Sequence, residues 1–420
     1  MTAWPRFKFY GTPDIFMAAA RDVLAGRVHD GDDVARLENE VCRMTGRRHA
    51  VAVPQARVGL YLVIREILAR TQRRKVILSP YTIYDVVNMV VCAGGTPVFA
   101  DVDPRSGNLD PITLPPLLDD DTAAVIVTHL HGMLADLSAI SALCDTHGSV
   151  LIEDVAQAFG GRWHGRMAGA VGQVGIFSFG RAKNVNCFFG GMVITDDDTL
   201  ATTIRTAIRQ WPEVATAVLA KRVIHCAIIA MAVSRLVFPW LTRHLFRRLA
   251  LVGERTGAAL FSTERNPIVR HTLPVAWHCR LTPMQARIAL TQLSGISTQQ
   301  EQRLALARIY ADGLRGIPEI THPESLPGAE DIFLGYAIQV PDRLACQEHL
   351  LWSGLDVVIQ HIGNCADYDV FAPFQRHCPQ TRHVADSVLI LPTYPGYPHA
   401  QAKNIVCALR SYFAQQPENQ

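Results

Sequence analysis

The sequence lacks the features of several well-known classes of protein. Its ten cysteines form no Cys-x-x-Cys pair and no Cys/His spacing suited to zinc, so we predict no metal site and expect free thiols. The formal net charge of only +2 gives no reason to expect a nucleic-acid interface. Residues 1–16 contain no apolar core of a signal peptide. We therefore expect a cytoplasmic globular protein.

One segment lacks acidic residues altogether. Residues 214–252 contain no Asp or Glu, although Lys and Arg recur there, and a 19-residue apolar run is interrupted by a single full charge, Arg235. A membrane-spanning helix needs about 20 predominantly apolar residues, so Arg235 and Pro239 argue against a simple span. Two interpretations stay open. The segment lies in the membrane interface against anionic lipid, at the inner face of the membrane. Alternatively, it is an amphipathic helical hairpin that packs on the protein or on a partner subunit.

The N-terminal half alternates between short apolar runs and helical patterns. We predict helices within 13–46 and at 58–69, 84–93 and 137–146, and strands at 49–53, 75–79, 97–101, 123–128, 151–154, 174–179 and 192–195. Strands that are apolar throughout indicate a parallel sheet covered by helices on both faces. Ligands of such α/β folds bind beyond the carboxyl ends of the strands.

Two residues near predicted strand ends indicate a particular chemistry. Asp154 follows one buried run, and Lys183 lies just beyond the strand at 174–179. Pyridoxal phosphate enzymes need a lysine that forms a Schiff base with the aldehyde, and an acid that keeps the pyridine nitrogen protonated. Either residue alone is more typical of a surface lysine or a helix cap than of a cofactor site.

Three motifs around these residues strengthen the cofactor interpretation. They are Asp154-x-x-Gln157, Ser178-Phe179-x-x-x-Lys183-Asn184 and Gly190-Gly191. Together they resemble the core signature of the DegT/StrS sugar aminotransferases, which are pyridoxal phosphate enzymes of the aspartate aminotransferase fold (fold type I). The resemblance implies that Lys183 is the Schiff-base lysine and Asp154 the partner of the pyridine nitrogen. It also implies that Gln157 lies beside the ring and that Ser178 binds the phosphate.

Other positions resemble the family less closely. At the strand-to-helix turn that holds the phosphate in the family, Ala56 and Arg57 replace Gly and Thr. Arg57 either binds phosphate through its planar guanidinium or faces solvent. Where the family stacks an aromatic ring on the pyridine, this chain has Ile83, with Tyr84 beside it. The stacking role passes to Tyr84 or is replaced by aliphatic packing.

The C-terminal part carries further matches. His278 stands where the family has an asparagine that reaches the cofactor phosphate of the neighbouring subunit, which implies a homodimer with shared active sites. Arg280 matches the same motif, and His361 falls where the family often has a histidine near the substrate. Both are candidate substrate residues. We predict one long helix over 284–314, strands at 335–340 and 357–360, and a last helix at 400–413. The run 389–395, just before that helix, resembles the family's Leu-Pro-x-Tyr-Pro motif.

The resemblance implies four parts along the chain. They are an N-terminal segment with a large pyridoxal-phosphate-binding domain (1–213), a hydrophobic basic helical insertion (214–253), a return segment with an interdomain helix (254–315) and a small α/β domain (316–420). The expected reaction is ping-pong transfer of an amino group from an amino acid, expected to be glutamate, to a keto sugar. Family members act on nucleotide-linked sugars, and the insertion adds a lipid-linked acceptor as an alternative.

Two other functions stay open. One is a different pyridoxal phosphate reaction on a membrane-associated substrate. Family members that dehydrate sugars replace the Schiff-base lysine with histidine, so Lys183 disfavours that branch. The other is a non-catalytic partner subunit that keeps the fold, because Ala56, Arg57 and His278 all depart from the phosphate-binding pattern.

Overall fold

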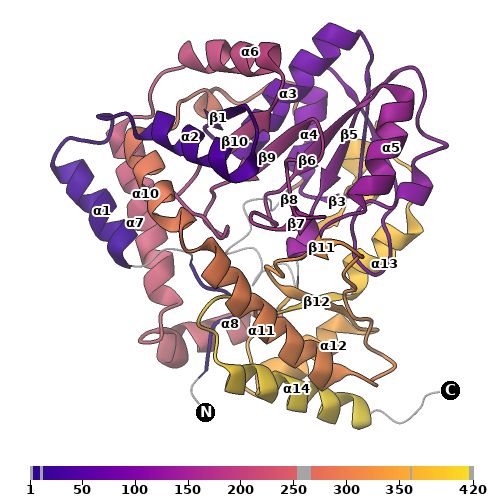
Figure 1. Cartoon of the computed structure of the whole chain (residues 1–420). Helices are drawn as coiled ribbons and strands as arrows, with labels where there is room; N and C mark the ends of the chain where they lie inside the picture. The colour runs from indigo at the N-terminus through magenta and orange to yellow at the C-terminus, as the bar shows by residue number, and fades with distance from the viewer. Residues whose placement is uncertain (1–2, 10–12, 253–265, 360–361, 416–420) are drawn as a thin grey trace.

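The computed structural model describes residues 3–9, 13–252, 266–359 and 362–415. Its centre is a seven-stranded sheet (Figure 1). In spatial order, the strands are β1 (His49–Val53), β10 (Gly191–Thr195), β9 (Val174–Ser178), β6 (Val150–Asp154), β5 (Thr122–Thr128), β2 (Lys75–Leu78) and β4 (Thr96–Phe99). β10 runs antiparallel to both of its neighbours, and the other pairings in this sheet are parallel. The predicted α/β fold with a mostly parallel sheet is confirmed.

Helices cover both faces of this sheet. One face packs against α3 (Ala56–Thr71), α4 (Tyr84–Cys92) and α6 (Asp198–Arg209), and the other against α2 (Asp33–Thr45), α5 (Leu137–His147) and α10 (Pro283–Leu293). Along β5, Ala124 and Ile126 face the first group, whereas Val125 and Val127 face the second. Successive side chains of a strand point to opposite faces, so burial of both faces explains why the strands are continuously apolar.

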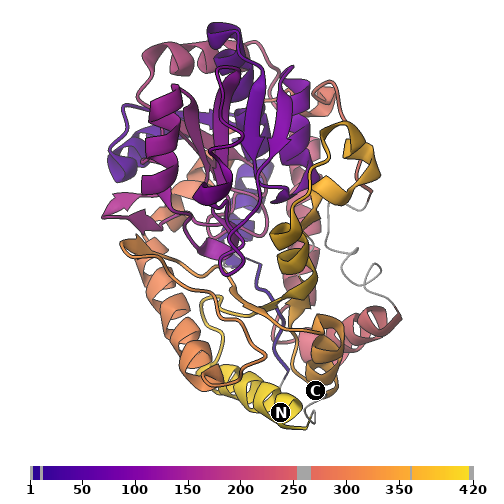
Figure 2. The ribbon, with the colours of Figure 1, turned by 90° about the vertical axis from the view of Figure 1, so that its right-hand side faces the viewer.

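A second hydrophobic core lies below the large sheet (Figure 2). Its antiparallel sheet consists of β12 (Tyr336–Gln339), β15 (Val388–Leu391) and β13 (Val358–Ile359), and the helices around it are α11 (Ile296–Leu314), α12 (Arg343–Trp352) and α14 (His399–Ala414). The predicted helix over 284–314 is wrong as a single element, because it is divided into α10 and α11 at Ser294–Gly295. The proposed domain boundaries at 213, 253 and 315 stay predictions.

Smaller elements connect these two cores. They are α1 (Pro13–Leu24), α13 (Pro379–Ser387), the ribbon β7 (Arg162–Trp163), β8 (Arg166–Met167) and β11 (Ala329–Glu330), and the pair β3 (Tyr81–Thr82) and β14 (Gly363–Asn364). The N-terminal segment is also tied to the C-terminal core. The Arg6 backbone N–H donates to the Asp356 carboxylate at 2.8 Å, and the Tyr394 hydroxyl donates to the Pro5 carbonyl at 2.9 Å.

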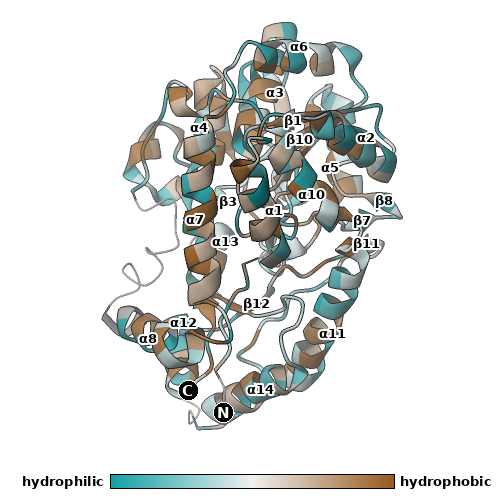
Figure 3. Cartoon of the chain, turned by 90° about the vertical axis from the view of Figure 1, so that its left-hand side faces the viewer, coloured by the Kyte–Doolittle hydropathy of each residue, from teal (hydrophilic) through white to brown (hydrophobic). Residues whose placement is uncertain are grey.

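The acid-free segment forms α7 (Thr216–Ala232), a π-helical turn (Phe238–Thr242) and α8 (Arg243–Val252). α7 buries Leu219, Val223 and Cys226 and packs against α1. α8 turns away from α7 and lies near α12, so the two helices do not form the helical hairpin of the second interpretation, although α7 does pack on the protein (Figures 1 and 3). Within the described ranges, no helix is long and apolar enough to cross a membrane.

The other side of this segment is apolar and exposed. Its exposed large hydrophobic side chains are Val218, Ile224, Ile228, Met231, Leu236, Trp240, Leu241 and Leu245. Trp240 is 82% exposed, so most of its indole ring is not covered by the protein. We call these eight side chains the exposed apolar surface of the insertion.

The packing of β9 gives a first testable prediction. A Cβ atom on Gly175 would lie 2.3 Å from the Gly169 carbonyl oxygen, and backbone cannot move aside as a flexible side chain can. We expect Gly175→Ala to lower the free energy of unfolding by about 1–3 kcal/mol in urea denaturation, the typical cost of overpacking. Gly295→Ala is the control, because its nearest neighbouring atom would lie at 3.6 Å. Equal losses in both variants would contradict the argument.

Candidate active site

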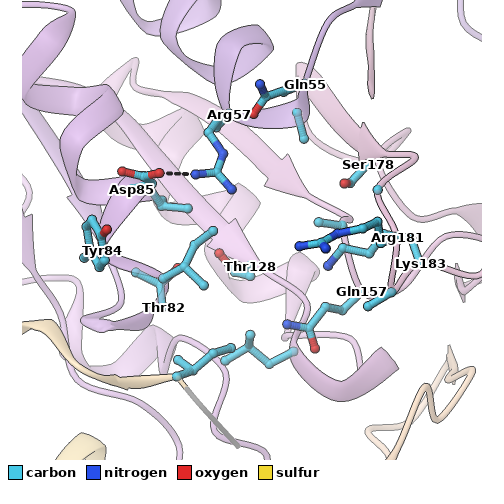
Figure 4. A pocket seen from close by; sticks show the side chains of 18 of the residues that line it. Gln55, Arg57, Thr82, Tyr84, Asp85, Thr128, Gln157, Ser178, Arg181 and Lys183 are labelled. Carbon is cyan, nitrogen blue, oxygen red and sulfur yellow. Dashed lines mark hydrogen bonds and ion pairs between the residues drawn. The ribbon is translucent and has the colours of Figure 1, made fainter. Parts of the chain in front are cut away.

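A cavity of about 1930 Å³ opens at the carboxyl edge of the parallel strands (Figure 4). Strands β5, β6 and β9 end there, and β10 begins there. The cavity is lined by most of the residues that the sequence singled out: Ala56, Arg57, Tyr84, Asp154, Gln157, Ser178 and Lys183. The structure therefore brings together side chains from four separate stretches of the chain.

Asp154 lies at the end of β6 with its carboxylate at the cavity wall. One carboxylate oxygen accepts a hydrogen bond from the Ala156 backbone N–H at 3.0 Å. Burial raises the pKa of Asp154, and the Ala156 hydrogen bond and the positive charge of Lys183 oppose this rise without cancelling it. A buried carboxylate in this position is stabilised by a cationic hydrogen-bond donor, and a protonated pyridine nitrogen is such a donor.

Lys183 lies on the loop that follows β9, and other parts of the chain hold this loop in place. The Asn184 side chain donates to the Phe159 carbonyl at 2.7 Å, and the Gln285 side chain donates to the Phe189 carbonyl at 2.6 Å. Gln285 itself is fixed by a capping box with Thr282 at the start of α10. Gln285 therefore positions the lysine loop.

The paired glycines that end this loop allow a close approach of backbone to backbone. A Cβ on Gly191 would lie 2.7 Å from the Ala56 nitrogen and 2.8 Å from the Phe177 carbonyl oxygen. Gly190 has φ +155°, which side chains rarely adopt. The pair lets β10 pass directly beside the first turn of α3, as the sequence predicted.

That first turn of α3 offers a place for an anion. Gln55 precedes the helix without capping it by its side chain, and Gln55, Ala56 and Arg57 all line the cavity. The N-terminus of a helix attracts anions through its unpaired N–H groups and its dipole. The Ser178 hydroxyl lines the same cavity, so both predicted phosphate-binding elements are present.

Arg57 fits neither of its two predicted roles completely. It forms an ion pair with the buried Asp85, and its guanidinium carbon lies 5.2 Å from the Trp277 ring centroid. Its side chain is only 22% exposed, so it does not face open solvent. A guanidinium has five N–H donors, so the pairing with Asp85 leaves donors for a phosphate. Figure 4 shows Arg57 pointing into the cavity beside Asp85.

The two predicted ring neighbours differ in position. The Gln157 side-chain oxygen accepts a hydrogen bond from the His131 backbone N–H at 3.0 Å, which fixes the amide at the cavity wall near Lys183 (Figure 4). Tyr84 is the first residue of α4 and lies beside Asp85, across the view from Lys183. Ile83 also lines the cavity, so aliphatic packing stays available at this wall.

Two of the predicted residues, His278 and Arg280, do not line this cavity. His278 packs edge-on against Trp211, with 5.0 Å between ring centroids. Arg280 donates to Glu213 at 2.8 Å. His361 lies outside the described residues. A role for His278 in the site of a neighbouring subunit remains a prediction.

Comparison with known proteins identifies the chain. A sequence model described as the DegT/DnrJ/EryC1/StrS aminotransferase family matches residues 14–221 and 245–410. The chain belongs to this family. It is an aminotransferase, a transferase of nitrogenous groups. The stretch between the two matched ranges, 222–244, falls within the predicted insertion.

Similar proteins span almost the whole aminotransferase chain. The dTDP-3-amino-3,4,6-trideoxy-alpha-D-glucose transaminase of Streptomyces venezuelae is 27% identical over 399 residues, covering 94% of this chain and 91% of that protein. The UDP-N-acetyl-3-dehydro-alpha-D-glucosamine 3-aminotransferase of Acidithiobacillus ferrooxidans is 28% identical over 382 residues, covering 90% and 88%. The crystal structure of S. venezuelae DesV in complex with a ketimine intermediate is similar to this structure with a TM-score of 0.76 and 25% sequence identity. The match covers 98% of this chain and 100% of that chain.

The aminotransferase cavity also contains residues that the sequence did not single out. Arg181 lies two positions before Lys183, and Thr128 ends β5. Lys221 and Arg222 come from α7, so part of the insertion forms a wall of the cavity. The position of Arg181 inside the lysine motif was a usable signal. The contribution of α7 depends on tertiary packing, so the sequence contained no signal for it.

Glu153, the neighbour of Asp154, is bound entirely within the protein. Its carboxylate accepts hydrogen bonds from the backbone N–H groups of Gly169, Val171 and Gly172 at 2.6–2.8 Å. It also contacts the His129 Nε2 at 3.2 Å, and because the Ala135 N–H donates to Nδ1, the ring proton is assigned to Nε2. Burial raises the pKa of Glu153, but these hydrogen bonds outweigh burial and lower it below its usual value.

Replacement of Glu153 should therefore destabilise the fold in a pH-dependent way. We expect Glu153→Gln to lower the free energy of unfolding at pH 7 by about 1–3 kcal/mol, because the neutral amide cannot accept all of these hydrogen bonds and leaves a buried N–H donor without a partner. Because the folded pKa is lowered, this stabilisation is complete above the ordinary pKa of 4.5 and is lost as the pH falls through the folded value. Urea denaturation between pH 7 and pH 3 should show the difference from wild type shrinking toward low pH.

Glu324→Gln is the matched control for that series. Glu324 pairs with Arg105 on the surface, where its side chain is 61% exposed. Its replacement should change stability by no more than about 0.5 kcal/mol at any pH. A pH-independent loss in Glu153→Gln would refute the electrostatic explanation.

Proposed function

We propose that this aminotransferase uses pyridoxal phosphate to move an amino group from an amino acid to a keto sugar. The observation that carries the proposal is the placement of Asp154 and Lys183, on the ends of two neighbouring strands, in one cavity. The charge of Lys183 acts on the Asp154 carboxyl, so the two groups are electrostatically coupled.

The residues of the cavity fit the cofactor. When bound, pyridoxal phosphate supplies an aldehyde and a ring that accepts electrons. Lys183 would hold the aldehyde, and Asp154 would hold the ring nitrogen protonated. The first turn of α3 and the Ser178 hydroxyl would bind the phosphate, and Gln157 would lie beside the ring. The raised pKa of the buried Asp154 supports this fit, because a carboxylate there needs a cationic partner.

The chain itself supplies proton transfer and electrostatic stabilisation. The Lys183 amine takes a proton from the α-carbon of the amino donor and returns a proton to the reacting group, as general base and then general acid. Asp154 stays ionised throughout and stabilises the positive charge that faces it. The donor leaves as a keto acid before the acceptor binds, so the kinetics are ping-pong. Glutamate is the proposed donor.

The relatives support a nucleotide-linked acceptor. Two of them are named for amino sugars carried on dTDP and UDP. A keto sugar on a nucleoside diphosphate is therefore the proposed acceptor, and a lipid-linked keto sugar is the alternative that the insertion supports.

We also propose a homodimer in which His278 of each chain reaches the partner's phosphate site. Light scattering that returns the mass of a single chain would refute the dimer.

Absorbance spectroscopy tests the cofactor and the lysine together. Wild-type protein with pyridoxal phosphate should show a visible absorbance band that shifts when glutamate is added. Lys183→Ala should abolish the band, because the covalent link to the aldehyde is lost. Lys403→Ala, an exposed lysine on α14, should keep both the band and the shift. A band that no amino donor shifts would favour another pyridoxal phosphate reaction, and an unchanged band in Lys183→Ala would refute the assignment.

We infer as well that the exposed apolar surface of the insertion lies against anionic lipid. One side of α7 is buried against the protein. The opposite side of the insertion exposes several large apolar residues, in a segment that contains no acidic residue. Arg235 and Arg248 are exposed in the same segment. Apolar side chains combined with basic ones are typical of helices that bind at the interface of negatively charged membranes.

Liposome flotation tests this contact. Wild-type protein should float with vesicles that contain phosphatidylserine, and Trp240→Glu should weaken flotation because it adds a charge where an apolar ring would enter the interface. Ile112→Glu is a matched control, because Ile112 is also 82% exposed but lies outside the insertion. Wild-type protein that stays unbound refutes the proposal. A Trp240→Glu variant that floats normally but loses self-association assigns the surface to a subunit interface instead.

A further inference from the structure

Several cations of the cavity have an acidic partner. Arg57 and Arg270 both pair with Asp85, and Arg382 pairs with Asp367. Arg181, Lys221 and Arg222 line the same cavity, yet in the described part of the chain none of these three forms an ion pair with Asp or Glu. We call these three residues the cation cluster.

Arg222 shows most clearly that the cluster is electrostatically incomplete. Its guanidinium carbon lies 3.8 Å from the centroid of the Phe189 ring, so the ring supports one face of the cation. Burial lowers the pKa of Arg222, and the positive charge of Arg181 acts in the same direction. Half-buried cations that face each other lose hydration without gaining a counter-charge, and an anion between them removes that cost.

The acidic residues of the cavity do not provide this counter-charge. Asp85 and Asp367 are already bound to arginines, and Asp154 is coupled to Lys183. Asp386 lines the cavity as well, but it forms no ion pair with the cluster. The ligand itself must therefore bring the negative charge.

We propose that Arg181, Lys221 and Arg222 bind the diphosphate group of the acceptor. A diphosphate carries more than one negative charge and several acceptor oxygens, which matches three cations better than a single carboxylate does. The cavity of about 1930 Å³ is also larger than the roughly 300–1,000 Å³ typical for small ligands. Arg181 lies two residues from Lys183 in the chain. A diphosphate bound to Arg181 would therefore place the sugar that it carries near the Lys183 amine. This inference rests on the proposed function.

The cluster links the insertion to substrate choice. The family match is interrupted after residue 221, and Lys221 and Arg222 stand at that point on α7. The same helix continues into the exposed apolar surface at Ile224 and Ile228. The same diphosphate group can be carried by a nucleoside or by a prenyl chain. The experiment below distinguishes these two carriers.

Isothermal titration calorimetry of the protein loaded with pyridoxal phosphate tests the cluster. The probes are uridine diphosphate, geranyl diphosphate and glutamate. Arg181→Gln and Arg222→Gln should each weaken diphosphate binding by roughly ten- to a hundredfold, the loss of one charge-assisted hydrogen bond. Arg222→Lys keeps the charge and should retain part of the affinity. Arg248→Gln, an exposed arginine on α8 outside the cavity, should bind as wild type does.

The outcomes separate this inference from the proposed function. The absorbance band of the wild-type protein and its response to glutamate report the proposed function, independently of diphosphate binding, and both should persist in Arg248→Gln. Tighter binding of uridine diphosphate assigns a nucleotide-linked acceptor, and tighter binding of geranyl diphosphate assigns a lipid-linked one; either supports the diphosphate site. Wild-type protein that binds neither probe, or Gln variants that lose only the glutamate response, overturn it. Thermal melting confirms that each variant is folded.

Discussion

A carboxylate that is buried at the end of a strand stays ionised only when hydrogen bonds or a positive charge compensate for its lost hydration. β6 ends with two such groups, Glu153 and Asp154, and successive side chains of a strand point to opposite faces. Backbone amides and His129 surround Glu153, so its charge stabilises the fold. Asp154 faces the cavity with one backbone hydrogen bond, so its charge remains for a ligand. The last two residues of β6 thus differ in environment: Glu153 is bound within the protein, and Asp154 faces the cavity.

Much of this arrangement could be predicted from the sequence because parallel strands bring their carboxyl ends to one edge. Once apolar runs located β5, β6 and β9, the short motifs at Asp154, Ser178 and Lys183 had to meet there. The break between α10 and α11 was missed because helical spacing continues on both sides of it. The Ser294-Gly295 pair was a turn signal that could have revealed the break.

The roles of the arginines could not be predicted, because the partner of a charge depends on packing between distant elements. Arg57 is separated from Asp85 by the rest of α3 and by the strands β2 and β3, yet these two residues and Trp277 form one group. Arg222 likewise meets Phe189 only because α7 returns to the lysine loop. The apolar character of the insertion was visible in the sequence, but neither the buried side of α7, at Leu219, Val223 and Cys226, nor the direction of α8 was predicted.

The attachment of the N-terminal segment to the C-terminal core has a consequence for synthesis. Arg6 is hydrogen-bonded to Asp356, 350 residues later in the chain, and Pro5 to Tyr394. During translation, the large sheet can assemble while these partners are still inside the ribosome, since domains fold as their residues emerge. Arg6 also lines the cavity. One wall of the cavity is therefore completed only after Asp356 and Tyr394 have emerged, and a ribosome-bound fragment with a finished sheet still lacks it.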